Sequence, residues 1–159
     1  MVKEYFMLMF QNKVLDTAII CWAVAQVLKF LINCFINKKI DITKLWSDGG
    51  MPSCHSSTVT GLAMMTGFTE GFRSTYFAIA CVFAFIVMHD AMGVRLETGK
   101  QAVLINDIIA FIQDTNPAKW SRDASEKRLK EFVGHTPTQV VAGFLVGLAC
   151  TVILYEIWF

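Results

Sequence analysis

Two short segments place a histidine beside hydroxyl residues where a polar loop gives way to an apolar stretch. His55 lies within 49–57, and His135 lies within 134–137. We expect both segments to be helix starts, where unpaired backbone N–H groups and the positive end of the helix dipole attract anions. The arrangement predicts that the two histidines share one anion site, and phosphate is the anion that it favours.

Each histidine has a chemical and a structural interpretation. We expect His55 to be a general acid or a phosphate ligand, with Ser53 and Ser56 holding phosphoryl oxygens. His135 is a candidate nucleophile that would form a phosphohistidine. The alternative is that each ring only caps a helix start. The recurrence of the arrangement favours chemistry for His55, whereas both interpretations of His135 stay open when it is considered alone.

A polar stripe crosses the first apolar stretch. Gln26, Lys29 and Asn33 are spaced at i, i+3 and i+7, which places them on one helical face. Lys29 would lie about 10 Å inside the span at ~1.5 Å per residue. Because an intramembrane charge is costly, we expect the stripe to face the bundle and Gln26 and Lys29 to bind substrate. The alternative is that Lys29 snorkels to the interface.

Charged residues follow the third apolar stretch. Asp90 can pair with Arg95 or Lys29, or orient a histidine, and we include it among the candidate catalytic residues. Arg95 has the planar fork that binds phosphate. His89 is equally consistent with an ordinary membrane boundary. Cys54 is interpreted as a small packing residue, because adjacent helical side chains diverge. The spacings of histidines and acids do not match a known metal motif, so we predict no metal and no cofactor.

Composition indicates an integral membrane protein. Of 159 residues, 55% are hydrophobic and 17% charged, whereas soluble domains are about a quarter charged. The length predicts one domain over 1–159. A net charge of +1 gives no indication of a nucleic-acid partner, and we predict none.

The apolar stretches predict an all-α, polytopic helix bundle with about four transmembrane helices. They cover 14–36, 53–69, 74–92 and 137–158. The second is short and rich in small residues, which suits the interior of a bundle. The fourth contains Gly143 and Gly147, a small-xxx-small pair that can pack against a second copy, so a homodimer is a candidate assembly.

Two further helices are expected between the third and fourth spans. Isoleucines in 100–114 recur at i, i+3, i+4 and i+7, which predicts an amphipathic helix that is interfacial or re-entrant. Residues 121–132 are charged and predict a short surface helix.

The distribution of Lys and Arg predicts the orientation. The loops after the first and third spans contain three and seven of these residues, and the opposite side contains three. The positive-inside rule places the basic loops in the cytoplasm and both termini outside the cell membrane. Both histidines then lie at the cytoplasmic face.

The histidine segments resemble a known superfamily. Met51–Ser56 resembles the Pro-Ser-Gly-His motif of the type 2 phosphatidic acid phosphatases, relatives of the vanadium haloperoxidases, and His135–Gly143 is similar to their third motif. With 89–95, 99–102 and 129–137, the resemblance covers most of the chain, which looks like the short divergent bacterial branch.

The resemblance implies a metal-independent phosphatase acting on a lipid phosphate such as phosphatidylglycerophosphate, phosphatidate or a prenyl diphosphate. His135 would attack phosphorus, and His55 would protonate the leaving group. Lys29 would correspond to the first-motif lysine and Ser53 to a phosphate ligand. The partners would then be a lipid phosphate and the surrounding membrane lipids.

Several positions depart from that pattern. Gln139 occupies the place of the acid that orients the nucleophile, and Ile36 and Leu129 occupy those of two arginines. Asp90 and Arg95 are the candidate replacements. A second hypothesis is therefore a catalytically degenerate protein that binds lipid head groups or a membrane partner. A transporter is a weaker third, since four short spans leave little room for two inverted repeats.

Overall fold

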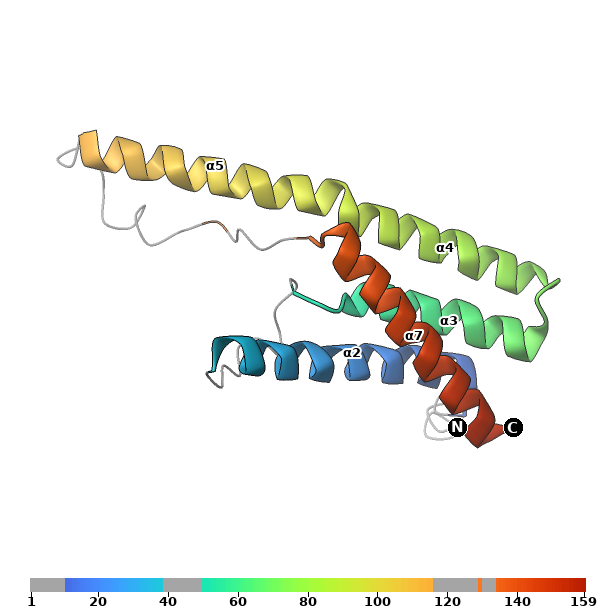
Figure 1. The fold of residues 1–159 in the computed structure, drawn as a ribbon. Coiled ribbons are helices and arrows are strands. Elements are labelled where there is room, and N and C mark those ends of the chain that lie inside the picture. The colour runs from blue at the N-terminus through green and yellow to red at the C-terminus, as the bar shows by residue number, and fades with distance from the viewer. Residues whose placement is uncertain (1–10, 39–49, 116–128, 130–133) are drawn as a thin grey trace, which may run out of the picture.

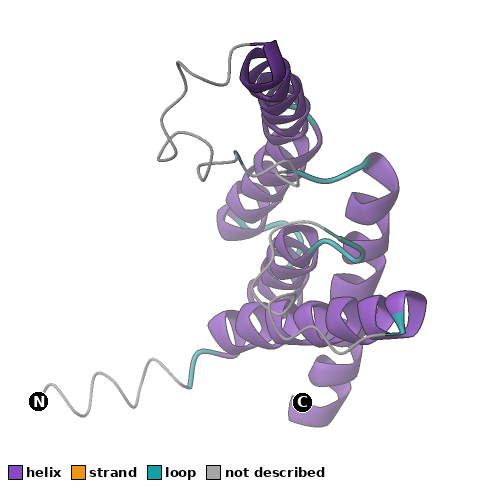
Figure 2. Ribbon diagram, turned by 90° about the vertical axis from the view of Figure 1, so that its left-hand side faces the viewer, coloured by secondary structure: helices purple, strands orange, loops and turns teal. Residues whose placement is uncertain are grey.

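The computed structural model describes residues 11–38, 50–115, 129 and 134–159. Its regular elements in these ranges are α2 (Lys13–Asn37), α3 (Cys54–Glu70), α4 (Thr75–Met92), α5 (Val94–Thr115) and α7 (Pro137–Trp158). Figure 2 shows only helices and loops in this part of the chain. The predicted all-α fold is therefore confirmed. The surface helix predicted over 121–132 lies outside the described residues except for Leu129.

Helix α3 forms the centre of the bundle. It packs against α2, α4 and α7, and α2, α3 and α4 run in alternating directions (Figure 1). The starts of α3 and α7 therefore lie at the same end of the bundle as the ends of α2 and α4. This is the arrangement that the predicted order of apolar stretches requires for the two histidine segments to meet.

Small residues allow the other helices to approach α3 closely. A Cβ atom at Gly61 would come within 2.6 Å of the Cys21 Sγ atom of α2. On α7, a Cβ at Gly147 would come within 2.5 Å of the Ser57 carbonyl oxygen, and one at Gly143 would overlap the carbonyl oxygen of Ser53. The two glycines of α7 are thus used within one chain. A homodimer stays a prediction, but this pair does not supply its interface.

Large apolar side chains point away from the bundle. The fully buried side chains include Cys21, Ser57 and Thr151, whereas Phe35, Phe85 and Ile157 are each more than 60% exposed. Between membrane helices, small residues permit close packing while large apolar residues can face lipid. This distribution is that of an integral membrane protein.

Three helical stretches of the described residues are long and apolar enough to cross a membrane. They are Lys13–Asn37, Thr75–Ile112 and Pro137–Trp158. Helix α3 has 17 residues, which corresponds to about 26 Å at ~1.5 Å per residue and is short for a hydrocarbon core of ~30 Å. The predicted count of four spans therefore depends on α3, which the other helices surround.

Helix α5 continues almost in line with α4 and extends beyond the bundle (Figure 1). The Gly93 N–H donates to the His89 carbonyl at 2.9 Å, and the Glu97 N–H donates to the Gly93 carbonyl at 3.0 Å. Helical hydrogen bonding thus resumes directly after Gly93. The amphipathic helix begins at Val94 instead of near residue 100 and is an extension of the third apolar stretch, not a separate element.

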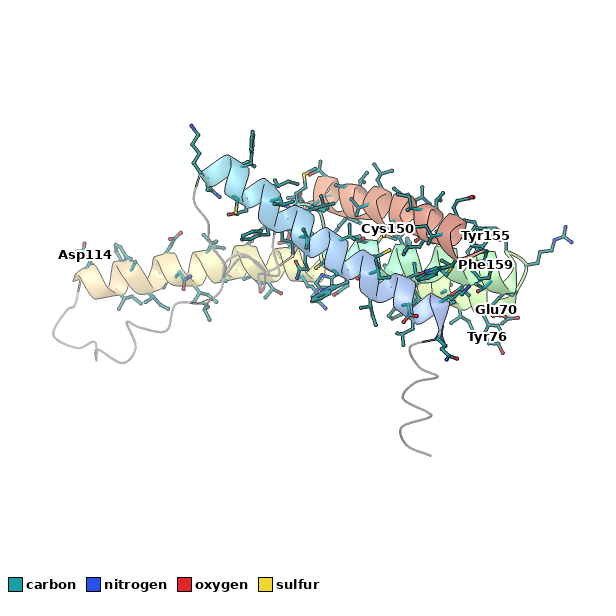
Figure 3. The ribbon with its side chains drawn as sticks, turned by 90° about the horizontal axis from the view of Figure 1, so that it is seen from below. Glu70, Tyr76, Asp114, Cys150, Tyr155 and Phe159 are labelled. Carbon is teal, nitrogen blue, oxygen red and sulfur yellow. The ribbon has the colours of Figure 1, made fainter. Side chains whose placement is uncertain are left out.

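The end of the bundle where α2 begins and α7 ends is held by a cation and aromatic rings. Lys13 Nζ donates to the Trp158 carbonyl at 2.9 Å and lies 3.7 Å from the Phe159 ring centroid. The rings of Phe68 and Tyr155 are 4.7 Å apart. Figure 3 shows Tyr155 and Phe159 at this end, far from Asp114 at the tip of α5. These contacts connect α2, α3 and α7 at the end opposite the histidines.

Candidate active site

The structure brings His55 and His135 together. His55 lies in the first turn of α3, and His135 directly precedes Thr136, the N-cap of α7. Their ring centroids are 5.8 Å apart, with an interplanar angle of 60°. His135 is 1% exposed and His55 is partly buried. The prediction that these distant histidines meet is confirmed, while their chemical roles stay predictions.

Two backbone hydrogen bonds fix the segments that carry the histidines. The Ser53 N–H donates to the Gln139 carbonyl at 3.0 Å, which joins the start of α3 to the first turn of α7. The His135 N–H donates to the Ala91 carbonyl of α4 at 2.9 Å. Gly134 has a φ of +105°, and a Cβ there would overlap the backbone of Leu96. Glycine thus lets the segment before His135 lie against the start of α5.

Gln139 contacts the imidazole of His135. Its Oε1 atom lies 3.2 Å from His135 Nδ1 and accepts the Thr136 N–H at 3.1 Å. The residue in the place of the superfamily's orienting acid thus occupies the position that an orienting group requires. The sequence shows that glutamine replaces the superfamily's acid at position 139, but it did not predict this contact.

Lys29 is buried inside the bundle. It is 3% exposed, and its Nζ atom donates to Cys54 Sγ at 3.7 Å. Gln26, one turn earlier, is 9% exposed, and Asn33 is partly buried. The prediction that the polar stripe faces inward is confirmed, and Lys29 does not snorkel to the surface. Its ammonium group is thereby placed at the start of α3.

Ser53 and Ser56 are enclosed at the contact between α3 and α7. Both are 0% exposed. Ser53 is the N-cap of α3, and its hydroxyl accepts the Ser56 N–H at 3.3 Å. The Ser56 hydroxyl has no hydrogen-bond partner among the described residues, and its Cβ faces Gly143. The structure therefore gives Ser53 a capping role, and phosphate binding by either serine stays a prediction.

Asp90 pairs with Arg95 at the rim of the site. Asp90 Oδ2 lies 2.6 Å from Arg95 Nε, and both side chains are partly exposed. Of the pairings considered for Asp90, the structure shows this one. His89 is exposed and stacks on Phe85 at 5.9 Å between ring centroids, which fits a boundary residue.

Cys54 belongs to the site, although its sequence indicated only packing. Besides contacting Lys29, its Sγ atom lies 3.9 Å from His55 Nδ1. Adjacent side chains on a helix diverge, but Cys54 is the first residue of α3, and its thiol is enclosed by Lys29 from the neighbouring helix. The described residues contain no group of three or more His, Cys, Asp or Glu residues that could hold a metal ion.

Fold and site define an integral membrane protein in which two histidines meet at helix starts. Residues 10–150 match the model of the Divergent PAP2 family, so the chain belongs to that family and the resemblance is confirmed. It is 42% identical over 135 residues to the uncharacterized membrane protein YuiD of Bacillus subtilis (strain 168), over 82% of this chain and 85% of that protein. No solved structure matches the chain.

Proposed function

We propose that the protein is a metal-independent phosphatase that hydrolyses a lipid phosphate through a phosphohistidine. The observation that carries the proposal is the 5.8 Å separation of the His55 and His135 rings. One phosphoryl group between the rings would contact a nucleophile and a proton donor together, as nucleophilic and general acid catalysis require. Membership of the Divergent PAP2 family supports the same chemistry.

The reaction would proceed in two steps. His135 Nε2 attacks phosphorus, and the P–N bond forms as the bond from phosphorus to the lipid oxygen breaks. His55 gives its proton to the departing oxygen. A water molecule then attacks the phosphohistidine and passes a proton to His55, which releases phosphate and restores both histidines.

Lys29 and Arg95 would neutralise the phosphoryl oxygens, because cations placed where negative charge develops stabilise the transition state. Lys29 already lies at the start of α3, beside Cys54. Arg95 would exchange its pairing with Asp90 for a phosphate oxygen. The positive end of the α3 dipole lies at the same place. Gln26, one helical turn before Lys29, would add a further polar group to the lining.

The substrate test uses purified protein in detergent with a chelator present. Phosphatidylglycerophosphate, phosphatidate and prenyl diphosphates are supplied separately, and released phosphate is measured. We expect turnover of at least one class without added metal, and inhibition by vanadate, whose oxyanion resembles the transferring phosphoryl group. If none of the three classes is turned over, with or without divalent metal, the proposed activity is excluded.

We place the active site at the cytoplasmic face of the cell membrane. Cysteines introduced at Arg73, in the α3–α4 turn, and at Lys100 of α5 report the two sides, because both positions are exposed and lie beyond opposite ends of α4. An impermeant maleimide added to intact cells should label Arg73→Cys, but Lys100→Cys only after lysis; the parent protein gives the background. The reverse pattern would place the site outside the cell.

A second candidate function follows from the neutral side chain of Gln139. An amide cannot stabilise an imidazolium as a carboxylate does, so the family fold could serve to bind lipid head groups or a membrane partner without turnover. The discriminating variant is Gln139→Asp. A gain in phosphate release would identify an enzyme weakened at one position, whereas lipid binding without turnover in both proteins would favour the binding role.

A further inference from the structure

The contact between Gln139 and His135 determines more than the orientation of the ring. Gln139 Oε1 receives the Thr136 N–H at 3.1 Å and lies 3.2 Å from His135 Nδ1. One end of the glutamine amide therefore faces two nitrogen atoms. Whether the imidazole donates or accepts a hydrogen bond at that contact depends on whether this end of the amide is oxygen or nitrogen.

The backbone settles the identity of the amide atom. Oxygen and nitrogen of a glutamine side chain are assigned from their hydrogen-bonding partners. The Thr136 N–H is a donor that cannot accept, so the atom facing it must be the carbonyl oxygen. The same oxygen can only accept a hydrogen bond from His135. Nδ1 must therefore carry the proton that lies between them.

We propose that Gln139 is a positioning residue that holds neutral His135 in the tautomer protonated at Nδ1. In a neutral imidazole only one nitrogen carries hydrogen, so Nε2 keeps its lone pair. The tautomer follows from the contact geometry, and its use by a nucleophile rests on the proposed function. Gln139 would thus orient the imidazole as the superfamily's acid does, but without a negative charge.

The position of Gln139 on α7 makes this role compatible with the fold. It is the third residue of the helix, where a Glu or Gln side chain commonly returns to the backbone N–H of the N-cap. A glutamate at 139 would offer the same acceptor to Thr136 and His135 and add a negative charge. A leucine would remove the acceptor and retain most of the volume.

The experiment measures the tautomer directly, by ¹⁵N NMR of the purified protein labelled at its three histidines. His135 signals are assigned by their loss in His135→Asn. At a pH where the ring is neutral, we expect Nδ1–H in the wild type and in Gln139→Glu, and a shift toward Nε2–H in Gln139→Leu. Thr138→Val, in the same turn, is the matched control and should leave the tautomer unchanged.

Activity provides the second measurement. We expect Gln139→Leu to lose up to about 10⁴-fold in kcat, the loss seen when a catalytic histidine takes the wrong tautomer, and Gln139→Glu to retain turnover. Nε2–H in the wild type, or an unchanged tautomer in Gln139→Leu, would overturn the inference even if phosphate is released. If the tautomers are as expected but the protein releases no phosphate, the inference about Gln139 stands and the proposed function fails.

Discussion

His135→Asn should lower phosphate release by at least about 10³-fold, because removing a nucleophile leaves only the contribution of binding and transition-state electrostatics. Asparagine is the replacement that best isolates the loss of Nε2. Its Nδ2 atom lies near the place of Nδ1 and can still donate to Gln139 Oε1, while nothing replaces Nε2. The measurement is phosphate release on the best lipid phosphate, together with acid-labile labelling of the wild type by a ³²P substrate.

The matched control for His135→Asn is His89→Ala. His89 is exposed and contacts Phe85, so we expect near wild-type turnover and no change in labelling. A thermal melt in detergent verifies that both variants fold. Turnover by well-folded His135→Asn at the wild-type rate would eliminate the phosphohistidine mechanism.

Gly143→Val should produce the largest loss of stability. The Cβ atom would overlap the Ser53 carbonyl oxygen and meet Ser56 Cβ at 3.0 Å. Neither α3 nor α7 can relieve this overlap by rotating a flexible side chain, because the first obstacle is backbone. Overpacking of this kind costs about 3 kcal/mol, or roughly 6–12 °C in Tm for a chain of this size. A thermal melt in detergent measures the shift.

Ala149→Val is the control for Gly143→Val. It adds a β-branched side chain to the same helix at an exposed position, so helix propensity changes in both variants but packing against α3 changes in one. We expect a Tm shift of no more than about 2 °C in the control. Equal melting of Gly143→Val and wild type would show that α3 and α7 do not make this contact.

The same contact couples stability to the site. Ser53 faces Gly143 through its carbonyl oxygen and donates its N–H to the Gln139 carbonyl. Any increase in the distance between α3 and α7 would therefore also change the separation of His55 and His135. Gly143 and Gly147 have no side chain that could take part in a reaction. They nevertheless set the separation of His55 and His135 on which the proposed reaction depends.

Local patterns in the sequence were enough to predict the helices and the inward face of α2. A stripe spaced at i, i+3 and i+7 lies on one side of a helix in any fold, and the cost of an intramembrane charge directs Lys29 into the bundle. The predicted order of the apolar stretches also placed both histidine segments at one membrane face. These conclusions need only helical geometry and the properties of a bilayer.

Contacts between distant segments were decided by the tertiary structure. Cys54 meets Lys29, His55 meets His135, and the Ser53 N–H donates to the Gln139 carbonyl. Each contact depends on how closely α2 and α7 approach α3. That distance is set by close packing at Gly61, Gly143 and Gly147 and not by any local pattern. The sequence thus determined which polar groups are available and at which end of the bundle they lie. Packing around α3 decided which of them touch.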